Sequence, residues 1–105
     1  MAKKKTLKDL KPGKKATLTR LVEFHRTIKY YQEHLPALLS TPSMIGQMEV
    51  TAAMVMVPYQ SEDQLSLGTH INVSHQGPAR VKEKLRTTAT FKKKYQPKHG
   101  GATRY

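Results

Sequence analysis

The sequence predicts a single α+β domain in which one central helix is buried and wrapped by an antiparallel sheet. An apolar run at residues 42–57 indicates the helix, and alternating apolar and polar residues at 65–75 indicate a long strand. Two threonine-rich segments, 14–24 and 80–91, also alternate and predict further strands. With 105 residues, of which 37% are apolar, the chain has material for one core only.

Helix signals surround the apolar run. Thr41 is the expected N-cap, and Pro42 suits the first helical position, where its missing N–H costs nothing. Pro58 is expected to stop the helix. Residues 50–57 are apolar on every side except Thr51, which predicts a helix buried all round.

The strands differ in the clarity of their pattern. Residues 80–91 follow a Gln-Gly-Pro turn, and residues 25–39 are expected to form a loop with a short helical turn, because they contain Pro36. The clearest strand, 65–75, places six side chains on its apolar face: Leu65, Leu67, Thr69, Ile71, Val73 and His75.

Charge divides the chain into three parts. The formal net charge is +12, yet residues 21–75 are mildly acidic and both ends are strongly basic. We therefore expect a basic N-terminal extension at 1–13, a folded domain at 14–91 and a basic tail at 92–105. Such ends either serve as a solvated, lysine-coated surface or attract phosphate-bearing polyanions.

Several classes of protein are not expected from the composition. The chain has no cysteine, and its five histidines lack zinc-site spacing, so no metal is predicted. No apolar run approaches the roughly 18–20 residues needed to span a bilayer, so no membrane partner is expected. The basic N-terminus lacks the apolar segment of a secretory signal, which favours a cytoplasmic location.

Three polar residues are candidates for a site. Glu49 is the one charged residue between Pro42 and Gln60, and a carboxylate on a buried helix needs either a partner or a function. His75 ends the apolar strand face, and Thr41 begins the helix, where free N–H groups favour an oxyanion. Singly, each also fits a structural role: a solvated glutamate, a core histidine, a helix cap. Together, they supply the groups that acyl transfer requires.

The same residues carry a family resemblance. The segment 41–49 resembles the start of the central helix in fluoroacetyl-CoA thioesterase-like hotdog proteins, and the likeness continues through 67–75. That family has a catalytic threonine, a glutamate eight residues later and a histidine a further twenty-six on. Thr41, Glu49 and His75 match the residue types and both intervals. A Gly-Thr dipeptide of the family, which helps to seat the substrate, matches Gly68 and Thr69.

The resemblance implies a hotdog-fold homodimer that hydrolyses acyl-CoA thioesters without metal or cofactor, with active sites near the subunit interface. Lys82, Lys84 and Arg86 are candidates for contacting the phosphates of CoA, although an exposed basic strand is also compatible with simple solvation.

The C-terminal part departs from the family pattern. Two further long strands and a substrate-gating arginine are expected after Phe91, and residues 92–105 supply neither, so we expect a hotdog fold shortened at this end. We therefore lean towards an enzyme and keep two alternatives. One is a non-catalytic hotdog domain whose basic ends bind RNA in a ribosome-like assembly, and the other is a truncated, inactive thioesterase.

Overall fold

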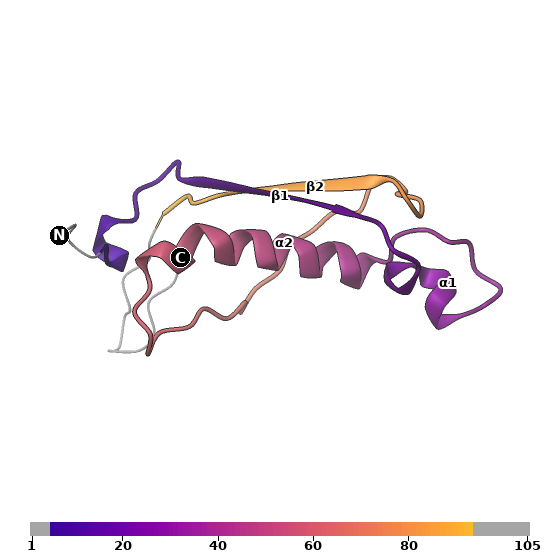
Figure 1. Ribbon diagram of the computed structural model, residues 1–105, viewed down its shortest axis with the longest axis horizontal. Helices are drawn as coiled ribbons and strands as arrows, with labels where there is room; N and C mark the ends of the chain where they lie inside the picture. The colour runs from indigo at the N-terminus through magenta and orange to yellow at the C-terminus, as the bar shows by residue number, and fades with distance from the viewer. Residues whose placement is uncertain (1–4, 94–105) are drawn as a thin grey trace.

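A computed structural model describes residues 5–93, in which one long helix lies against a two-stranded antiparallel ribbon (Figure 1). Four elements carry the fold: β1 (Lys15–Leu21), α1 (Ile28–Tyr31), α2 (Thr41–Met56) and β2 (Lys84–Thr90). Short 3-10 turns occur at Leu7–Asp9, Phe24–Arg26 and Val57–Tyr59. The predicted mixture of one central helix and an antiparallel sheet is confirmed.

The start of α2 differs from the prediction by one residue. Ser40 is the N-cap, and its hydroxyl accepts a hydrogen bond from the Ser43 N–H at 3.2 Å. The expectation that Thr41 caps the helix is therefore wrong: Thr41 and Pro42 are the first two helical residues. Since Ser40 satisfies the cap, the Thr41 hydroxyl is free for another partner. The helix ends two residues before Pro58, as predicted.

The loop before α2 is confirmed as a loop with short helical turns. Isolated bridges join Thr27 to Leu39 and Leu38 to Arg80. The Ser40 N–H also donates to the Arg26 carbonyl at 2.9 Å. These bonds hold the first turn of α2 against both the preceding loop and the chain that enters β2.

Both strands of the ribbon fall inside the predicted segments. The register runs from Lys15 opposite Thr90 to Leu21 opposite Lys84. Side chains alternate between two faces, because opposite residues of an antiparallel pair share a face. The face towards α2 carries Ala16, Leu18, Leu85, Thr87 and Ala89.

The apolar core lies at one end of the ribbon. Leu10, Val55, Tyr59 and Phe91 form a buried cluster, in which Leu10 is only 1% exposed. Each such burial contributes about 1.5–3 kcal/mol. Leu10 is therefore part of the core, although it lies in the segment 1–13. The boundary predicted between this extension and the domain stays a prediction.

Polar side chains fill the middle of the interface between α2 and the ribbon. The Gln47 amide Nε2 donates to the carbonyl oxygens of Leu85 at 2.8 Å and Leu18 at 3.3 Å, one on each strand. The Thr51 hydroxyl donates to the Gln47 carbonyl at 2.8 Å and also forms a hydrogen bond with the Thr87 hydroxyl. Gln47 and Thr51 are both buried. These hydrogen bonds fix the position of α2 along both strands of the ribbon.

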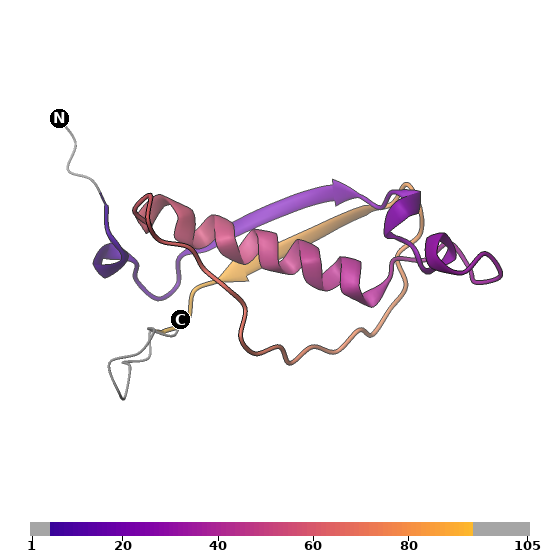
Figure 2. The same ribbon diagram turned by 90° about the horizontal axis from the view of Figure 1, so that it is seen from below.

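The predicted strand at 65–75 is wrong for this chain. The segment is extended and runs alongside α2, but it pairs with no other part of residues 5–93 (Figure 2). A strand requires a neighbour for its N–H and C=O groups, and here none lies within reach of this segment. Its apolar face is therefore open to solvent, with Leu65 and Leu67 73% and 79% exposed.

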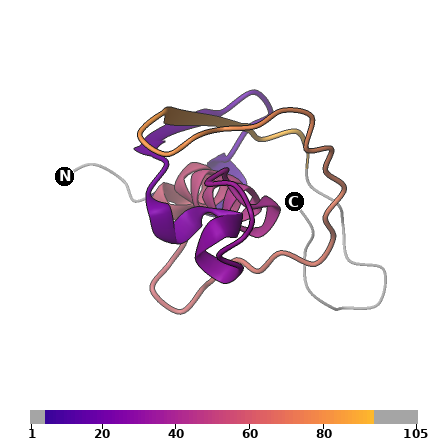
Figure 3. The same ribbon diagram turned by 90° about the vertical axis from the view of Figure 1, so that its right-hand side faces the viewer.

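The expected burial of α2 on all sides is also wrong. Its buried residues are Gln47, Thr51 and Val55, which share the face towards the ribbon, whereas Val50 and Met54 are each 41% exposed. Figure 3, which views the molecule end-on, shows the ribbon on one side of the helix only. Two strands are too narrow to wrap a helix, so its other side stays uncovered.

We predict that Gln47→Leu destabilises the fold by about 1–3 kcal/mol, because it removes the side-chain donor of the Leu85 carbonyl and leaves the Leu18 carbonyl with the Thr87 hydroxyl alone. Urea unfolding monitored by circular dichroism measures the change. Met48→Leu, on the exposed side of the same turn, is the matched control and should shift stability by less than about 0.5 kcal/mol. Equal stability of the two variants would contradict the anchoring role.

Candidate active site

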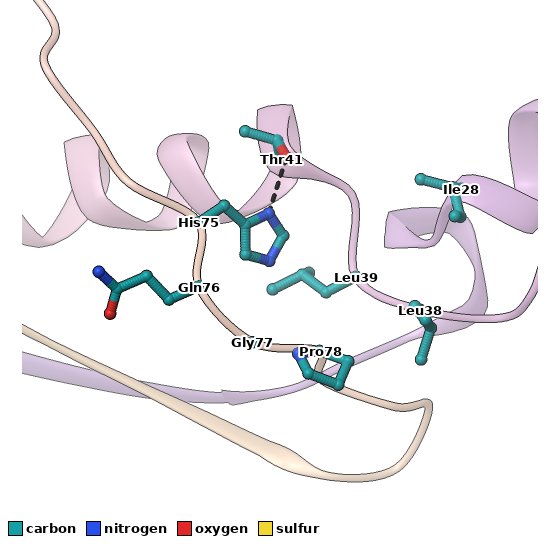
Figure 4. A pocket seen from close by; sticks show the side chains of 8 residues that line it. All are labelled: Ile28, Leu38, Leu39, Thr41, His75, Gln76, Gly77 and Pro78. Atoms are coloured by element: carbon teal, nitrogen blue, oxygen red, sulfur yellow. Dashed lines mark hydrogen bonds between the residues drawn. The ribbon is translucent and has the colours of Figure 1, made fainter.

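Thr41 and His75 meet at the start of α2. The Thr41 hydroxyl oxygen lies 2.7 Å from His75 Nδ1, a hydrogen bond between residues far apart in sequence (Figure 4). Thr41 comes from the first turn of the helix and His75 from the extended segment that follows it. The structure thus brings two of the three predicted catalytic residues into direct contact. An imidazole in this position can exchange a proton with a hydroxyl or with a substrate beside it.

An open pocket adjoins this pair. It has a volume of about 390 Å³, and its residues come from the loop before α2, from the pair itself and from the turn after His75. That volume falls in the range of small-molecule sites, and one wall is apolar. The residues around it, drawn in Figure 4, are Ile28, Leu38, Leu39, Thr41, His75, Gln76, Gly77 and Pro78.

Glu49 lies elsewhere along the helix and is exposed, so its predicted burial is wrong. The reason is that α2 is covered by the ribbon on one side only, and Glu49 faces the extended segment instead. Its carboxylate oxygen Oε2 lies 3.8 Å from where a Cβ on Gly68 would sit. Glu49 therefore lies beside Gly68, the residue expected to seat the substrate, and Thr69 follows in the same exposed segment.

The candidate residues thus form two separate pairs within one chain, Thr41 with His75 and Glu49 with Gly68. Thr41 and Glu49 are eight positions apart on the helix, a rise of about 12 Å along the axis. Gly68 and His75 are seven positions apart in the extended segment, a span of at most about 25 Å. The two pairs of one chain therefore lie about two turns of α2 apart.

The three predicted phosphate contacts lie away from the pocket. Lys84 and Arg86 are on the face of β2 that points away from α2, and Lys82 occupies the turn before that strand with φ of 74°. A different cation lies nearer: Arg80, whose backbone bridges to Leu38 of the pocket wall.

Sequence reasoning missed Gln47, Ser40 and Arg80. Gln47 had a signal, since Gln47 and Thr51 are four residues apart and place two polar groups on one face of an apolar helix. The guanidinium of Arg26 donates to Gln47 Oε1 at 3.5 Å, which completes the polar contact. Nothing in the sequence marked Ser40 over Thr41 as the cap, because both are good caps.

Within residues 5–93, no group of three histidine or acidic side chains is arranged to hold a metal ion. In the same part of the chain, no helix combines the length and apolar character needed to cross a membrane.

Solved structures with the same arrangement are hotdog-fold thioesterases. The chain matches a fluoroacetyl-CoA thioesterase FlK structure with a TM-score of 0.74 at 28% identity, covering 79% of this chain and 66% of that one. A threonine-to-alanine mutant of FlK in complex with fluoro-acetate matches with a TM-score of 0.74 at 25% identity, covering 79% and 67%. A phenylalanine-to-alanine mutant in complex with fluoroacetate and CoA gives 0.72 at 26%, covering 79% and 71%.

The chain therefore has the hotdog fold and spans about two-thirds of the length of these proteins. The sequence model of the fluoroacetyl-CoA-specific thioesterase family, FlK, matches residues 22–98, which is most of the chain. The protein belongs to this family. A search of curated proteins gave no match.

The contact between Thr41 and His75 can be tested without any substrate. Thr41→Val keeps the shape of the side chain but removes the hydroxyl, whereas Thr41→Ser retains it. In two-dimensional ¹H–¹⁵N spectra of the imidazoles, we expect the His75 Nδ1 signal to move in the valine variant and to stay close to wild type in the serine variant. The exposed His70 provides the internal control. An unchanged His75 signal in Thr41→Val would refute the hydrogen bond.

Proposed function

We propose that this protein hydrolyses acyl-CoA thioesters. The observation that carries the proposal is the hydrogen bond between the Thr41 hydroxyl and His75 Nδ1 beside an apolar-walled pocket, in a chain of the fluoroacetyl-CoA-specific thioesterase family. The FlK structures in complex with fluoroacetate and CoA support this substrate class by likeness.

In the proposed reaction, the acyl group lies against the apolar wall of the pocket, and the thioester carbonyl approaches the Gly68 backbone. The Glu49 carboxylate takes a proton from water while the water oxygen attacks the carbonyl carbon. The resulting tetrahedral intermediate collapses, the C–S bond breaks, and the thiolate of CoA receives the proton that Glu49 took from water. His75 assists this proton transfer and Thr41 orients the attack. The products are a carboxylic acid and free CoA, and no metal or cofactor takes part.

The CoA phosphates need cations near the pocket mouth. Arg80 suits this role better than Lys84 and Arg86, because its backbone adjoins the pocket wall at Leu38. The other two project from the far face of the ribbon.

We further infer that the working unit is a homodimer in which two copies share each site. The segment 65–75 has unpaired backbone groups and an exposed apolar face, which are the properties of an edge strand that can pair with another chain. Two copies related by a two-fold axis can pair this segment antiparallel to itself.

A two-fold register that places Thr69, the neighbour of Gly68, opposite His75 of the second copy would join the two halves of the site, because Thr69 and His75 lie on the same face of the segment. The Glu49 and Gly68 pair of one copy would then lie beside the Thr41 and His75 pair of the other. This arrangement supports a function for both pairs, because a single chain keeps them apart.

Glu49→Gln tests the reaction. Removal of the base should lower thioester hydrolysis by about 10²–10⁴-fold, measured as free thiol released from a panel of short acyl-CoAs. Glu62→Gln is the matched control, since Glu62 is another exposed glutamate and lies in a turn outside the site. Wild-type protein that releases no more thiol than Glu49→Gln would overturn the proposed activity.

Mixing two inactive variants tests the shared site. Glu49→Gln and His75→Ala are each expected to be inactive as homodimers. In a mixed dimer, one of the two sites receives an intact Glu49 and an intact His75, so an equimolar mixture should recover about a quarter of wild-type activity. The variants are mixed in mild denaturant and refolded together, and each refolded alone is the control. Equal inactivity of the mixture and the separate variants would place all three residues in one chain.

A further inference from the structure

The outer face of the ribbon, which points away from α2, carries an unusual set of side chains. It comprises Lys15, Thr17, Thr19, Leu21, Lys84, Arg86, Thr88 and Thr90. All are cations or threonines except one leucine, and no acidic residue occurs in either strand. We call this set the outer face.

The cations of the outer face have no acidic neighbour to neutralise them. Lys15, Lys84 and Arg86 are exposed, and none forms an ion pair within residues 5–93. The nearest acid in sequence, Glu83, lies outside β2, forms no ion pair among the described residues and accepts a hydrogen bond from the Arg80 backbone N–H at 2.9 Å. Glu23 pairs with His25 beyond the end of β1. Charge is therefore segregated: the acids lie on other segments, and the ribbon presents positive charge alone.

Two of the cations lie close together on one strand. Lys84 and Arg86 are two residues apart on β2, which corresponds to about 6.8 Å along the strand. That interval corresponds to about two phosphate steps along one strand of a duplex, which carries one phosphate per roughly 3.4 Å of axis. Lys15 lies at the other end of the ribbon, opposite Thr90, and extends the positive charge over its length.

Threonine hydroxyls lie between the cations. The Thr17 and Thr88 hydroxyl oxygens, a cross-strand pair, are 3.2 Å apart, so both hydroxyls are on this face. Hydroxyls beside lysine and arginine are common donors to phosphate oxygens. They add hydrogen bonds without adding charge.

We propose that the outer face binds the phosphate backbone of a nucleic-acid duplex. An antiparallel ribbon of two strands has the dimensions to follow a groove. The face has no aromatic residue on which unpaired bases could stack, which favours a duplex over a single strand. Its single leucine provides too little apolar surface to enter a membrane. Recognition rests on the backbone charge and is independent of base sequence.

This surface is separate from the proposed active site. The helix α2 lies on the opposite side of the ribbon, and Thr41, Glu49 and His75 lie on α2 or on the segment beyond it (Figures 1 and 3). Duplex binding and thioester hydrolysis can therefore succeed or fail independently.

The test is fluorescence anisotropy with labelled 24-base-pair duplexes of RNA and of DNA, titrated with the full chain at several salt concentrations. The charge variant is Lys84→Gln with Arg86→Gln, and the matched control is Lys8→Gln with Lys29→Gln, which removes the same charge from outside the ribbon. The logarithm of the association constant falls as the logarithm of the salt concentration rises. Losing two phosphate contacts should make that slope shallower by about 1.8 and weaken binding roughly 60-fold at 100 mM salt. The control variant should retain wild-type affinity to within a few-fold.

Each outcome decides the proposal. Equal losses in the two variants would show that net charge alone drives binding, and that result overturns the outer face as a site. Absence of duplex binding, or tighter binding to vesicles containing phosphatidylserine than to either duplex, also overturns it. The RNA and DNA arms show which duplex is preferred. Glu49→Gln should bind the duplex like wild type even where it hydrolyses no thioester.

Discussion

The amide of Gln47 is the contact on which the rest of the structure depends. It donates to one carbonyl on each strand, so it ties the helix to β1 and β2 together. A purely apolar interface would tolerate sliding of the helix over the ribbon, because hydrophobic contacts have little directionality. Hydrogen bonds to two fixed carbonyls remove that freedom. The position of Thr41 at the start of the helix, and of Glu49 two turns later, follows from this anchor.

Local signals in the sequence predicted the elements well where neighbouring residues decide the structure. Pro42 and Pro58 marked the helix, and the threonine-rich alternation marked both strands. The spacing of Thr41 and His75 also predicted their proximity, through the family resemblance. The precise cap was beyond prediction because Ser40 and Thr41 have almost the same preference.

The errors arose where structure depends on distant partners. The pattern of residues 65–75 correctly reported an extended chain with one apolar face, but a strand also needs a neighbour, and alternation says nothing about one. Glu49 was misplaced for a related reason. The composition of α2 suits burial on all sides, whereas the two strands present cover only the side that carries Gln47, Thr51 and Val55. The composition of a helix indicates which of its faces can be buried. The sheet that packs on the helix determines which of them are buried.

The proposed pairing of segment 65–75 between two copies would have a kinetic consequence. A site that exists only when two copies meet makes the rate depend on protein concentration. Well below the dissociation constant of the dimer, turnover would rise with the square of the amount of protein rather than in proportion to it. Modest changes in expression would then act as a steep control on activity. The same open edge, left without its partner in a dilute or overheated sample, is the place where aggregation would begin.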